Sequence, residues 1–306
     1  MRSTTAAGIW LGLIAVAAAV GWLFHAGPAS RPLAGKPTQP VEIFQGITYH
    51  SYRLADSPHG GGMVHVVRAD LNQPGVGVYV GGPEADAAPP WRYRTRYPWQ
   101  VASRRDLAVT VNGLMFGSRV QGRLSQRTDP GTGWWRLAHN AVPVNDAART
   151  RMTAIADGLV NLRSDRLKLI WQDAAGQVHF TGRLGDDPTG YEQAVWGVGG
   201  DLLFVAGGRP EAWAVANPHQ PQARCVIGVN SRENQVWLIV FEWADYRLVA
   251  EQVARHGPRF ALNLDGGGST CMVIGPGARG VEPGTRLGGY RPSAVPIGFL
   301  ARRIEP

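Results

Sequence analysis

Short β-forming segments follow one another along the chain from Val41 onward, and this pattern limits the fold more than any other feature. Each segment is rich in β-branched or aromatic residues and is bounded by Gly or Pro, which is typical of strands joined by turns. The 40 Gly and 22 Pro among the 306 residues can supply many such turns. We expect strands at Met63–Leu71, Val76–Val80, Ala108–Val111, Leu167–Trp171, Leu202–Ala206, Cys225–Val229, Val236–Glu242, Phe260–Leu264 and Ala294–Leu300.

Helical periodicity is confined to two segments, Tyr97–Leu107 and Tyr246–His256. The second segment places its apolar residues on one face of a helix and ends before Gly257. It connects two of the expected strands, so one strand–helix–strand unit lies within a chain made mainly of strands. We therefore predict an α+β fold, with a large mixed β-sheet, few helices and a single catalytic domain.

Residues 6–24 form an uncharged apolar stretch near the N-terminus. About twenty such residues span a bilayer, whereas the apolar region of a cleaved signal peptide is only about 7–15 residues long. Arg2 favours a cytoplasmic N-terminus. We predict a signal anchor over residues 1–27, with a cleaved signal peptide as the alternative, then a Pro-, Gly- and Ala-rich tether over 28–41 and the catalytic domain over 42–306. The domain then lies on the periplasmic or extracellular face, anchored to the inner membrane, or is secreted.

The formal net charge of +8 comes almost entirely from Arg, which is spread along the chain with no run longer than a pair. Nucleic-acid-binding proteins usually gather their basic residues into a patch or stripe, so we do not expect a nucleic acid as partner. Codon bias in a GC-rich genome would produce the same excess of Arg. An anionic glycan or another acidic partner is the alternative explanation.

Several standard chemistries are excluded by inspection. The sequence has no His-Glu-x-x-His and no Walker-type Gly-Lys-Ser/Thr, and its two cysteines do not form a Cys-x-x-Cys pair. The segment Gly267–Cys271 approaches the Gly-x-Ser-x-Gly nucleophile motif but has Cys where the last Gly is needed. We therefore expect no metal and no cofactor.

The segment Ala261–Thr270 combines residues that can carry chemistry. An apolar strand brings the Asp265 carboxylate to its C-terminal end, and Gly266, Gly267, Gly268 and Ser269 follow at once. Glycines let a backbone approach a ligand closely and present successive N–H groups to an oxyanion or a phosphate. The carboxylate can act as a general acid or base, or can bind a sugar hydroxyl. The alternative is a Gly-rich turn that Asp265 merely caps.

Asn-Leu-Asp-Gly-Gly-Gly-Ser at residues 263–269 resembles the signature of the phosphodiester glycosidase family. Four other segments resemble family motifs in the same order: Val111–Phe116, Arg224–Val229, Val236–Glu242 and Arg291–Pro292. The chain departs from these motifs at Leu114, Cys225, Glu242 and Tyr290. The resemblance covers roughly residues 60 to 300 and implies hydrolysis of a glycosyl phosphodiester, without a cofactor.

Three further side chains join Asp265 in the expected site. Asn112 would position the sugar, Arg224 would fork onto a phosphoryl oxygen, and Glu242 would be the second carboxylate of an acid/base pair. Each residue also has an alternative role without function. Asn112 would be a turn residue, Arg224 would form a salt bridge at the strand edge, and Glu242 would be a solvated residue at a strand end. We predict Asp265 and Glu242 as catalytic, and these residues as substrate-binding: Asn112, Arg224, Gly266, Gly267, Gly268, Ser269 and Arg291.

The leading hypothesis is an extracytoplasmic hydrolase acting on a sugar-phosphate diester or on an anionic cell-surface glycan. The alternative is a non-catalytic glycan-binding protein in exopolysaccharide assembly or export. Cys225 and Cys271 belong to motifs that should converge, so a disulfide between them is expected; two buried reduced cysteines are the alternative.

Overall fold

The computed structural model describes residues 39–81, 93–94, 97–105, 107–113, 127–128, 168–182, 194–200, 202–287 and 296–301. The expected signal anchor, residues 28–38 of the expected tether and Arg291 lie outside this part. No helix in the described ranges is long and apolar enough to cross a membrane.

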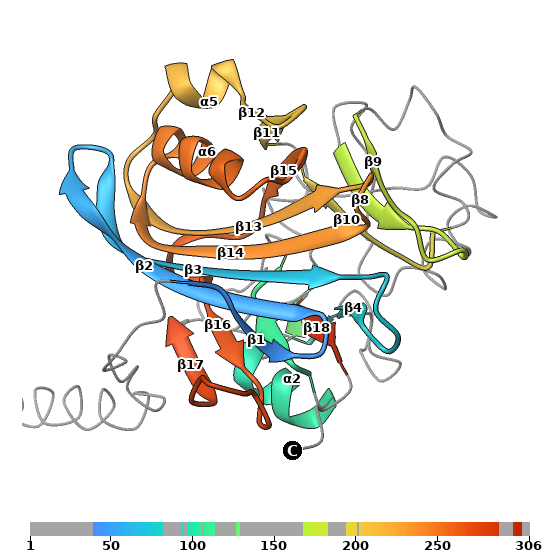
Figure 1. Ribbon diagram of the computed structural model, residues 1–306. Helices are drawn as coiled ribbons and strands as arrows, with labels where there is room; N and C mark the ends of the chain where they lie inside the picture. Colours follow the sequence, from blue (N-terminus) through green and yellow to red (C-terminus); the bar gives the residue numbers. More distant parts are fainter. Residues whose placement is uncertain are drawn as a thin grey trace, which may run out of the picture.

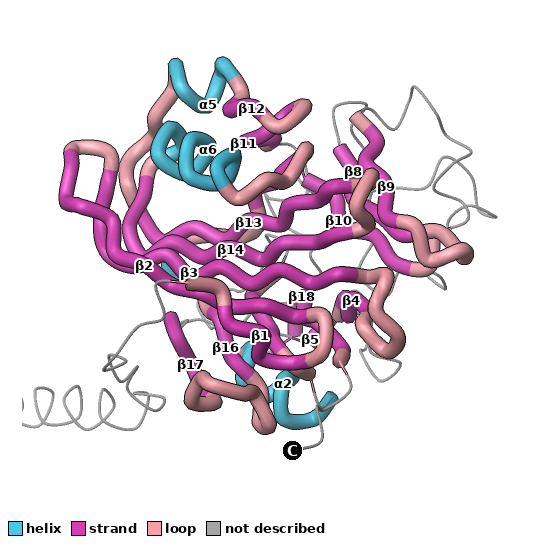
Figure 2. Tube along the Cα trace, in the orientation of Figure 1, coloured by secondary structure: helices cyan, strands magenta, loops and turns pink. Residues whose placement is uncertain are grey.

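An eight-stranded sheet forms the centre of a mostly β, single-domain structure (Figures 1 and 2). Its strands lie side by side in the order β1-β2-β3-β14-β13-β15-β11-β12, and every neighbouring pair is antiparallel. The strands are β1 (Val41–Phe44), β2 (Ile47–Ser57), β3 (Gly60–Asp70), β11 (Leu203–Ala206), β12 (Arg209–Pro210), β13 (Gln222–Asn230), β14 (Gln235–Ala244) and β15 (Phe260–Asn263).

Smaller sheets accompany it. A five-stranded antiparallel sheet has the order β17-β16-β6-β18-β4. Its strands are β4 (Gly77–Val80), β6 (Val109–Val111), β16 (Met272–Ile274), β17 (Gly284–Leu287) and β18 (Ile297–Leu300). A third sheet consists of β8 (Lys168–Gln172), β9 (Val178–Thr181) and β10 (Trp196–Gly200), and β5 (Tyr93–Arg94) pairs with β7 (Arg127–Thr128).

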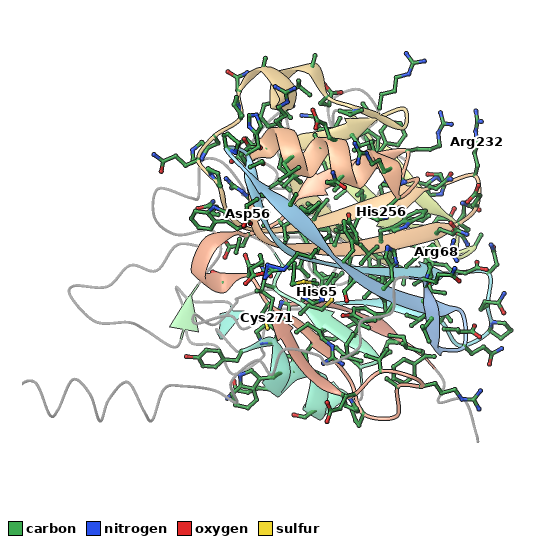
Figure 3. All side chains as sticks on the ribbon, turned by 60° about the vertical axis from the view of Figure 1, so that its left-hand side comes forward. Asp56, His65, Arg68, Arg232, His256 and Cys271 are labelled. Carbon is green, nitrogen blue, oxygen red and sulfur yellow. The ribbon has the colours of Figure 1, made fainter. Side chains whose placement is uncertain are left out.

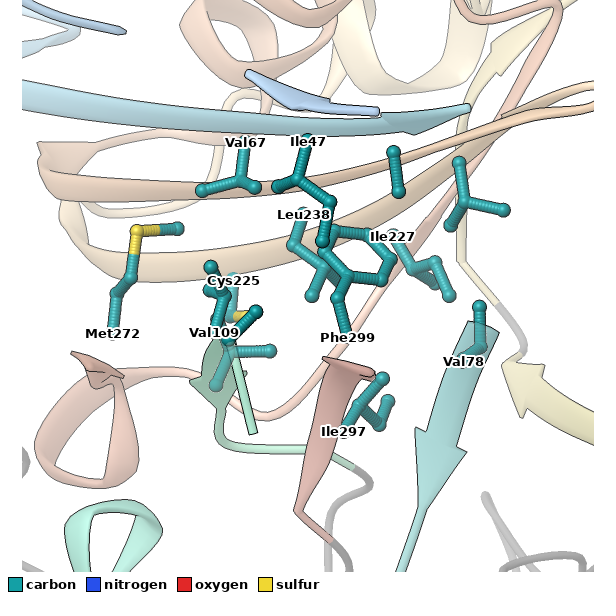
Figure 4. Close-up of a cluster of buried hydrophobic side chains, with 14 of the residues drawn as sticks. Ile47, Val67, Val78, Val109, Cys225, Ile227, Leu238, Met272, Ile297 and Phe299 are labelled. Carbon is teal, nitrogen blue, oxygen red and sulfur yellow. The ribbon is translucent and has the colours of Figure 1, made fainter. Parts of the chain in front are cut away.

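The main core lies between the eight- and five-stranded sheets. Ile47 and Val67 point from the large sheet toward Val109, Ile297 and Phe299 of the smaller one (Figure 4). All five side chains are fully buried. We call this side of the large sheet its inner face, and the opposite side its outer face.

Helix α6 (Tyr246–Arg255) covers the outer face, beside α5 (Ala212–Ala216); α2 (Pro98–Arg105) lies at the smaller sheet (Figure 1). The α6 helix begins at Asp245, whose carboxylate accepts a hydrogen bond from the Leu248 N–H at 2.8 Å. Its apolar residues Val249 and Val253 are buried against the sheet. An amphipathic helix buries its apolar face in this way, as the sequence predicts.

The expected mixed sheet is wrong, because every described strand pairing is antiparallel. The strand–helix–strand unit does exist, as β14, α6 and β15. However, β13 lies between β14 and β15 and is antiparallel to both. The two outer strands of this unit therefore run in the same direction without pairing.

Candidate functional site

The Asp265–Gly268 turn lies where β15 leaves the large sheet and the chain passes to β16 of the smaller one. The Leu264 N–H donates to the Cys225 carbonyl of β13 at 2.8 Å, and the Asp265 N–H donates to the Gly113 carbonyl, which follows β6, also at 2.8 Å. The Asp265 Oδ1 accepts from the Gly266 N–H at 2.9 Å. These bonds hold the carboxylate at a point where both sheets contribute backbone.

Glycine is required at two positions of this turn. A Cβ at Gly266 would lie 3.0 Å from the Ala223 carbonyl oxygen of β13, tighter than side chains normally pack. Gly267 has a φ of +65°, in the left-handed region that favours glycine. The turn therefore lies flat against the end of β13 and begins a 3-10 turn, η2 (Gly267–Ser269).

The Asn112 side chain joins the two sheets and is completely buried. Its Nδ2 donates to the Asp265 carbonyl at 2.6 Å, and its Oδ1 accepts from the Cys271 N–H at 3.0 Å. Both ends of the Gly-rich turn are thus tied to one amide. In this structure Asn112 shapes the turn that carries Asp265, while its amide is already occupied by protein groups.

Cys225 and Cys271 are both free thiols and both buried, so the expected disulfide is not formed. The Cys225 Sγ lies 3.6 Å from the Asn112 carbonyl oxygen. Burial raises the pKa of the Cys225 thiol well above its usual value, with further contributions from the charges of Asp265 and Cys271. The motifs therefore converge as expected, with the cysteines acting as small buried groups.

Glu242 lies near the end of β14, on the inner face of the large sheet. Phe241 and Ala244 both belong to the cluster on the outer face, although they are three residues apart. The pairing of β14 with β13 shifts by one residue there, so Glu242 and Trp243 both fall on the inner side of a bulge. The Glu242 carboxylate accepts from the Met63 N–H of β3 at 2.8 Å. The Trp243 side chain is 53% exposed.

Arg224 is 1% exposed and points to the outer face at the start of β13. Its Nε donates to the Ala244 carbonyl at 3.3 Å, and its Nη2 donates to the Gln220 carbonyl at 3.0 Å. The guanidinium carbon lies 4.3 Å from the centroid of the Tyr246 ring. Burial lowers the pKa of Arg224. These contacts join β13, β14 and α6 at one corner, rather than leaving an open fork for an anion.

Three polar residues were not among the expected site residues: Tyr49 and His65 on the inner face of the large sheet, and Arg286 on β17 of the five-stranded sheet. The Tyr49 hydroxyl lies 2.9 Å from the His65 Nδ1, and the two rings stack with centroids 6.2 Å apart. Figure 3 shows His65 with Cys271 on the side of the sheet away from His256. A histidine inside the apolar run of β3 was a visible signal for one of them, whereas Arg286 lies in a Gly- and Pro-rich stretch that gives none.

The structure thus brings Asp265, Asn112 and the glycine turn together. It places Glu242 at the end of β14, which β13 separates from the strand before Asp265, and turns Arg224 toward the other face. The two carboxylates could transfer protons, and the turn could approach a phosphate closely. Among the described residues, no group of three or more His, Cys, Asp or Glu side chains could hold a metal ion.

Comparisons with known proteins address the family and the fold. The sequence model of the phosphodiester glycosidase family matches residues 106–299 of the chain. No curated protein sequence gives a significant match.

Two solved structures share the fold. One is the catalytic domain of zebrafish N-acetylglucosamine-1-phosphodiester alpha-N-acetylglucosaminidase, auto-inhibited by its pro-peptide, with a TM-score of 0.55 and 16% identity over 92% of this chain and 93% of that one. The other is a hypothetical protein from Synechocystis, with a TM-score of 0.53 and 17% identity over 88% of this chain. The chain spans 64% of the Synechocystis protein.

Proposed function

Because the chain belongs to the phosphodiester glycosidase family, we propose that it hydrolyses the bond between a sugar and a phosphate in a glycosyl phosphodiester. Family membership supports a glycosidase-type function in general. The zebrafish enzyme of the same fold is named for an N-acetylglucosamine-1-phosphodiester, which supports this substrate class. An anionic cell-surface glycan is a related substrate of the same chemistry.

The observation that carries the proposal is the Asp265–Gly268 turn, held against β13 and fixed by Asn112 at both ends. A catalytic carboxylate must be held in a defined position relative to the reacting bond. Asp265 lies where backbone from both sheets meets, in a turn that has glycine at one crowded position and at one left-handed position. We assign the acid/base or nucleophile role to Asp265, with Glu242 as its partner.

The remaining expected residues take supporting roles. The glycines of the turn, Gly266, Gly267 and Gly268, are partly exposed and can contact the sugar or the phosphate, and the buried Ser269 ends the turn. Because the Arg224 guanidinium is buried among carbonyl oxygens, we propose that it positions the corner of β13, β14 and α6. Arg291, matching the closing Arg-Pro of the family, is retained as a candidate for binding the substrate. We further propose that residues 1–27 anchor the domain outside the cytoplasm.

The proposal is tested by incubating the purified protein with a panel of glycosyl phosphodiesters and measuring the release of free sugar and phosphate monoester. Glu242→Gln should lower kcat roughly 10²–10⁴-fold, the usual contribution of a general acid or base. Glu233→Gln is the matched control, because Glu233 is exposed in the turn between β13 and β14 at the other end of the same strand. Absence of turnover on every diester and envelope glycan would contradict the proposal.

A further inference from the structure

The Arg286 side chain crosses the space between the two sheets. It starts from β17, the edge strand of the five-stranded sheet, and its guanidinium carbon lies 6.0 Å from the ring centroid of Tyr49 on β2. Within the described part of the chain, its Nε and Nη2 are buried and have no hydrogen-bond partner. Buried N–H groups without a partner are costly, so these two atoms favour a ligand that brings acceptor oxygens.

The surroundings of Arg286 are polar and can donate hydrogen bonds. The Tyr49 ring lies beside the Arg286 guanidinium, and the Tyr49 hydroxyl lies 2.9 Å from the His65 Nδ1. Both Tyr49 and His65 are buried on the inner face of the sheet. The charged neighbour of Arg286 is Glu282, which is exposed. A guanidinium, a phenol ring and an imidazole ring, the two rings joined by one hydrogen bond, therefore come together from two sheets.

This cluster continues toward the proposed catalytic residues along both sheets. On the smaller sheet, Leu287 pairs with Met272, and Met272 pairs with Val111, so Arg286 lies two strands from the residue that precedes Asn112. Two strand spacings amount to about 10 Å. On the large sheet, His65 is two residues from Met63, whose N–H binds Glu242.

A backbone separation of about 10 Å between β17 and the end of β6, where Asn112 binds the turn of Asp265, is compatible with one substrate contacting both that turn and the guanidinium. A catalytic group approaches its reacting atom to ~3 Å. A guanidinium hydrogen-bonds to phosphate oxygens at a comparable distance, and it does so with two parallel N–H groups. The phosphorus of a glycosyl phosphodiester follows the anomeric carbon after a single oxygen, so its phosphate would reach toward Arg286.

We propose that Arg286, together with Tyr49 and His65, forms the subsite that binds the phosphate group of the substrate. The inference rests on the proposed function for its choice of substrate, but binding of phosphate can be measured without turnover. It differs from the expectation that Arg224 is the anion-binding arginine. The guanidinium donors of Arg224 already face backbone carbonyls, whereas Arg286 retains two donors for an incoming anion.

The test is isothermal titration calorimetry with methyl phosphate on four forms of the full-length protein: wild type, Arg286→Gln, Arg286→Lys and Arg209→Gln. The last is the matched control, because Arg209 is an exposed arginine on β12, at the opposite edge of the large sheet. We expect the Kd to rise at least tenfold in Arg286→Gln, to rise less in Arg286→Lys, and to stay unchanged in Arg209→Gln. The KM for a glycosyl phosphodiester should rise in the same order.

In the calorimetry, the subsite would be overturned by no binding of methyl phosphate to the wild type, or by equal binding to wild type and Arg286→Gln. If Arg286→Gln does not fold, Arg286→Lys provides the comparison, since it keeps the charge and loses the planar fork. The two proposals fail separately. If methyl phosphate binds in a way that depends on Arg286 but no diester is cleaved, only the proposed function is contradicted. If a diester is cleaved with a KM that does not depend on Arg286, only the subsite is contradicted.

Discussion

At the scale of single residues, Asn112 shows how a polar side chain can be essential to a site without facing solvent. Its amide binds the backbone on both sides of the Gly-rich turn, and it is fully buried. Removing one partner of a buried hydrogen bond leaves the other unsatisfied, at a cost of about 1–3 kcal/mol for each group. Asn112 therefore helps the backbone bonds of Leu264 and Asp265 to fix the position of the turn.

We expect Asn112→Ala to lower the free energy of unfolding by about 2–4 kcal/mol, because two buried backbone groups lose their partner. Turnover should fall as well, since the turn is released. Urea denaturation and an assay on the same sample measure both quantities. Asn217→Ala is the control, because Asn217 is exposed and donates to one carbonyl only. Equal free energies of unfolding for the two variants would show that the two hydrogen bonds of the Asn112 side chain contribute nothing to stability.

The two cysteines give a second prediction at this scale. Burial raises the pKa of the Cys225 thiol, so little reactive thiolate forms near neutral pH. Both thiols should resist a disulfide reagent in the folded protein and react fully in urea. Mass spectrometry of the non-reduced protein should show two free thiols. A mass lower by two hydrogens would instead mean that the expected Cys225–Cys271 bridge forms.

At the scale of elements, the bulge between β3 and β14 controls where Glu242 lies. Gly62 has a φ of +77°, and a Cβ there would lie 2.6 Å from the Glu242 Oε2. Regular alternation along β14 would place Glu242 and Trp243 on opposite faces. The bulge brings both to the inner face, an arrangement that strand periodicity in the sequence does not reveal.

Gly62→Ala should therefore displace the Glu242 carboxylate and lower kcat, with a loss of about 1–2 kcal/mol in stability from the left-handed backbone. Gly77→Ala serves for comparison: its φ is ordinary, and its Cβ would lie 3.8 Å from a Leu300 methyl group, a normal contact. Kinetics and thermal unfolding distinguish the two. If both variants keep full kcat, Glu242 does not need the bulge for its role.

The end of α6 is fastened to β2 through a histidine. The His256 Nε2 lies 2.9 Å from the Tyr52 hydroxyl. Burial, followed by the charges of His50 and Arg255, lowers the pKa of His256 to about 4. The unfolded chain binds the proton near pH 6.5, whereas the folded protein resists it until about pH 4. Stability should therefore fall as pH drops through this window.

The slope due to His256 should be at most about 1.4 kcal/mol per pH unit. His256→Gln should flatten the dependence of the free energy of unfolding on pH between pH 6.5 and 4, because the neutral amide cannot take up a proton. His219→Gln, at an exposed position, should leave the dependence as in the wild type. Denaturant titrations at four or five pH values measure how the free energy of unfolding depends on pH. Identical curves for wild type and His256→Gln would contradict this account.

At the scale of the whole molecule, the sequence allowed most strands of the large sheet and helix α6 to be predicted, because alternating and helical patterns are local. The sequence also predicted that an apolar strand ends just before Asp265. Strand β2 was overlooked, although Ile47, Tyr49 and Ser51 alternate with more exposed residues. The antiparallel order of the strands was not predictable, since it depends on β13 entering between β14 and β15.

The proposed phosphate subsite was not predictable from the sequence either, because it also depends on how distant strands are arranged. Arg286 meets Tyr49 and His65 only because the two sheets stack face to face, and it follows both of them by more than two hundred residues of sequence. No spacing rule connects them. Asp265 and its glycines are contiguous, so their grouping can be read directly from the chain.

In the proposed function, the Asp265 carboxylate performs chemistry that a neutral amide of the same size cannot perform. The most direct measurement compares wild type and Asp265→Asn for both the hydrolysis of a glycosyl phosphodiester and the affinity for it. We expect Asp265→Asn to lower kcat at least a hundredfold and to change the Kd for the diester by less than about threefold. Turnover by Asp265→Asn at the wild-type rate would contradict it, and so would a wild type that binds the diester without ever cleaving it.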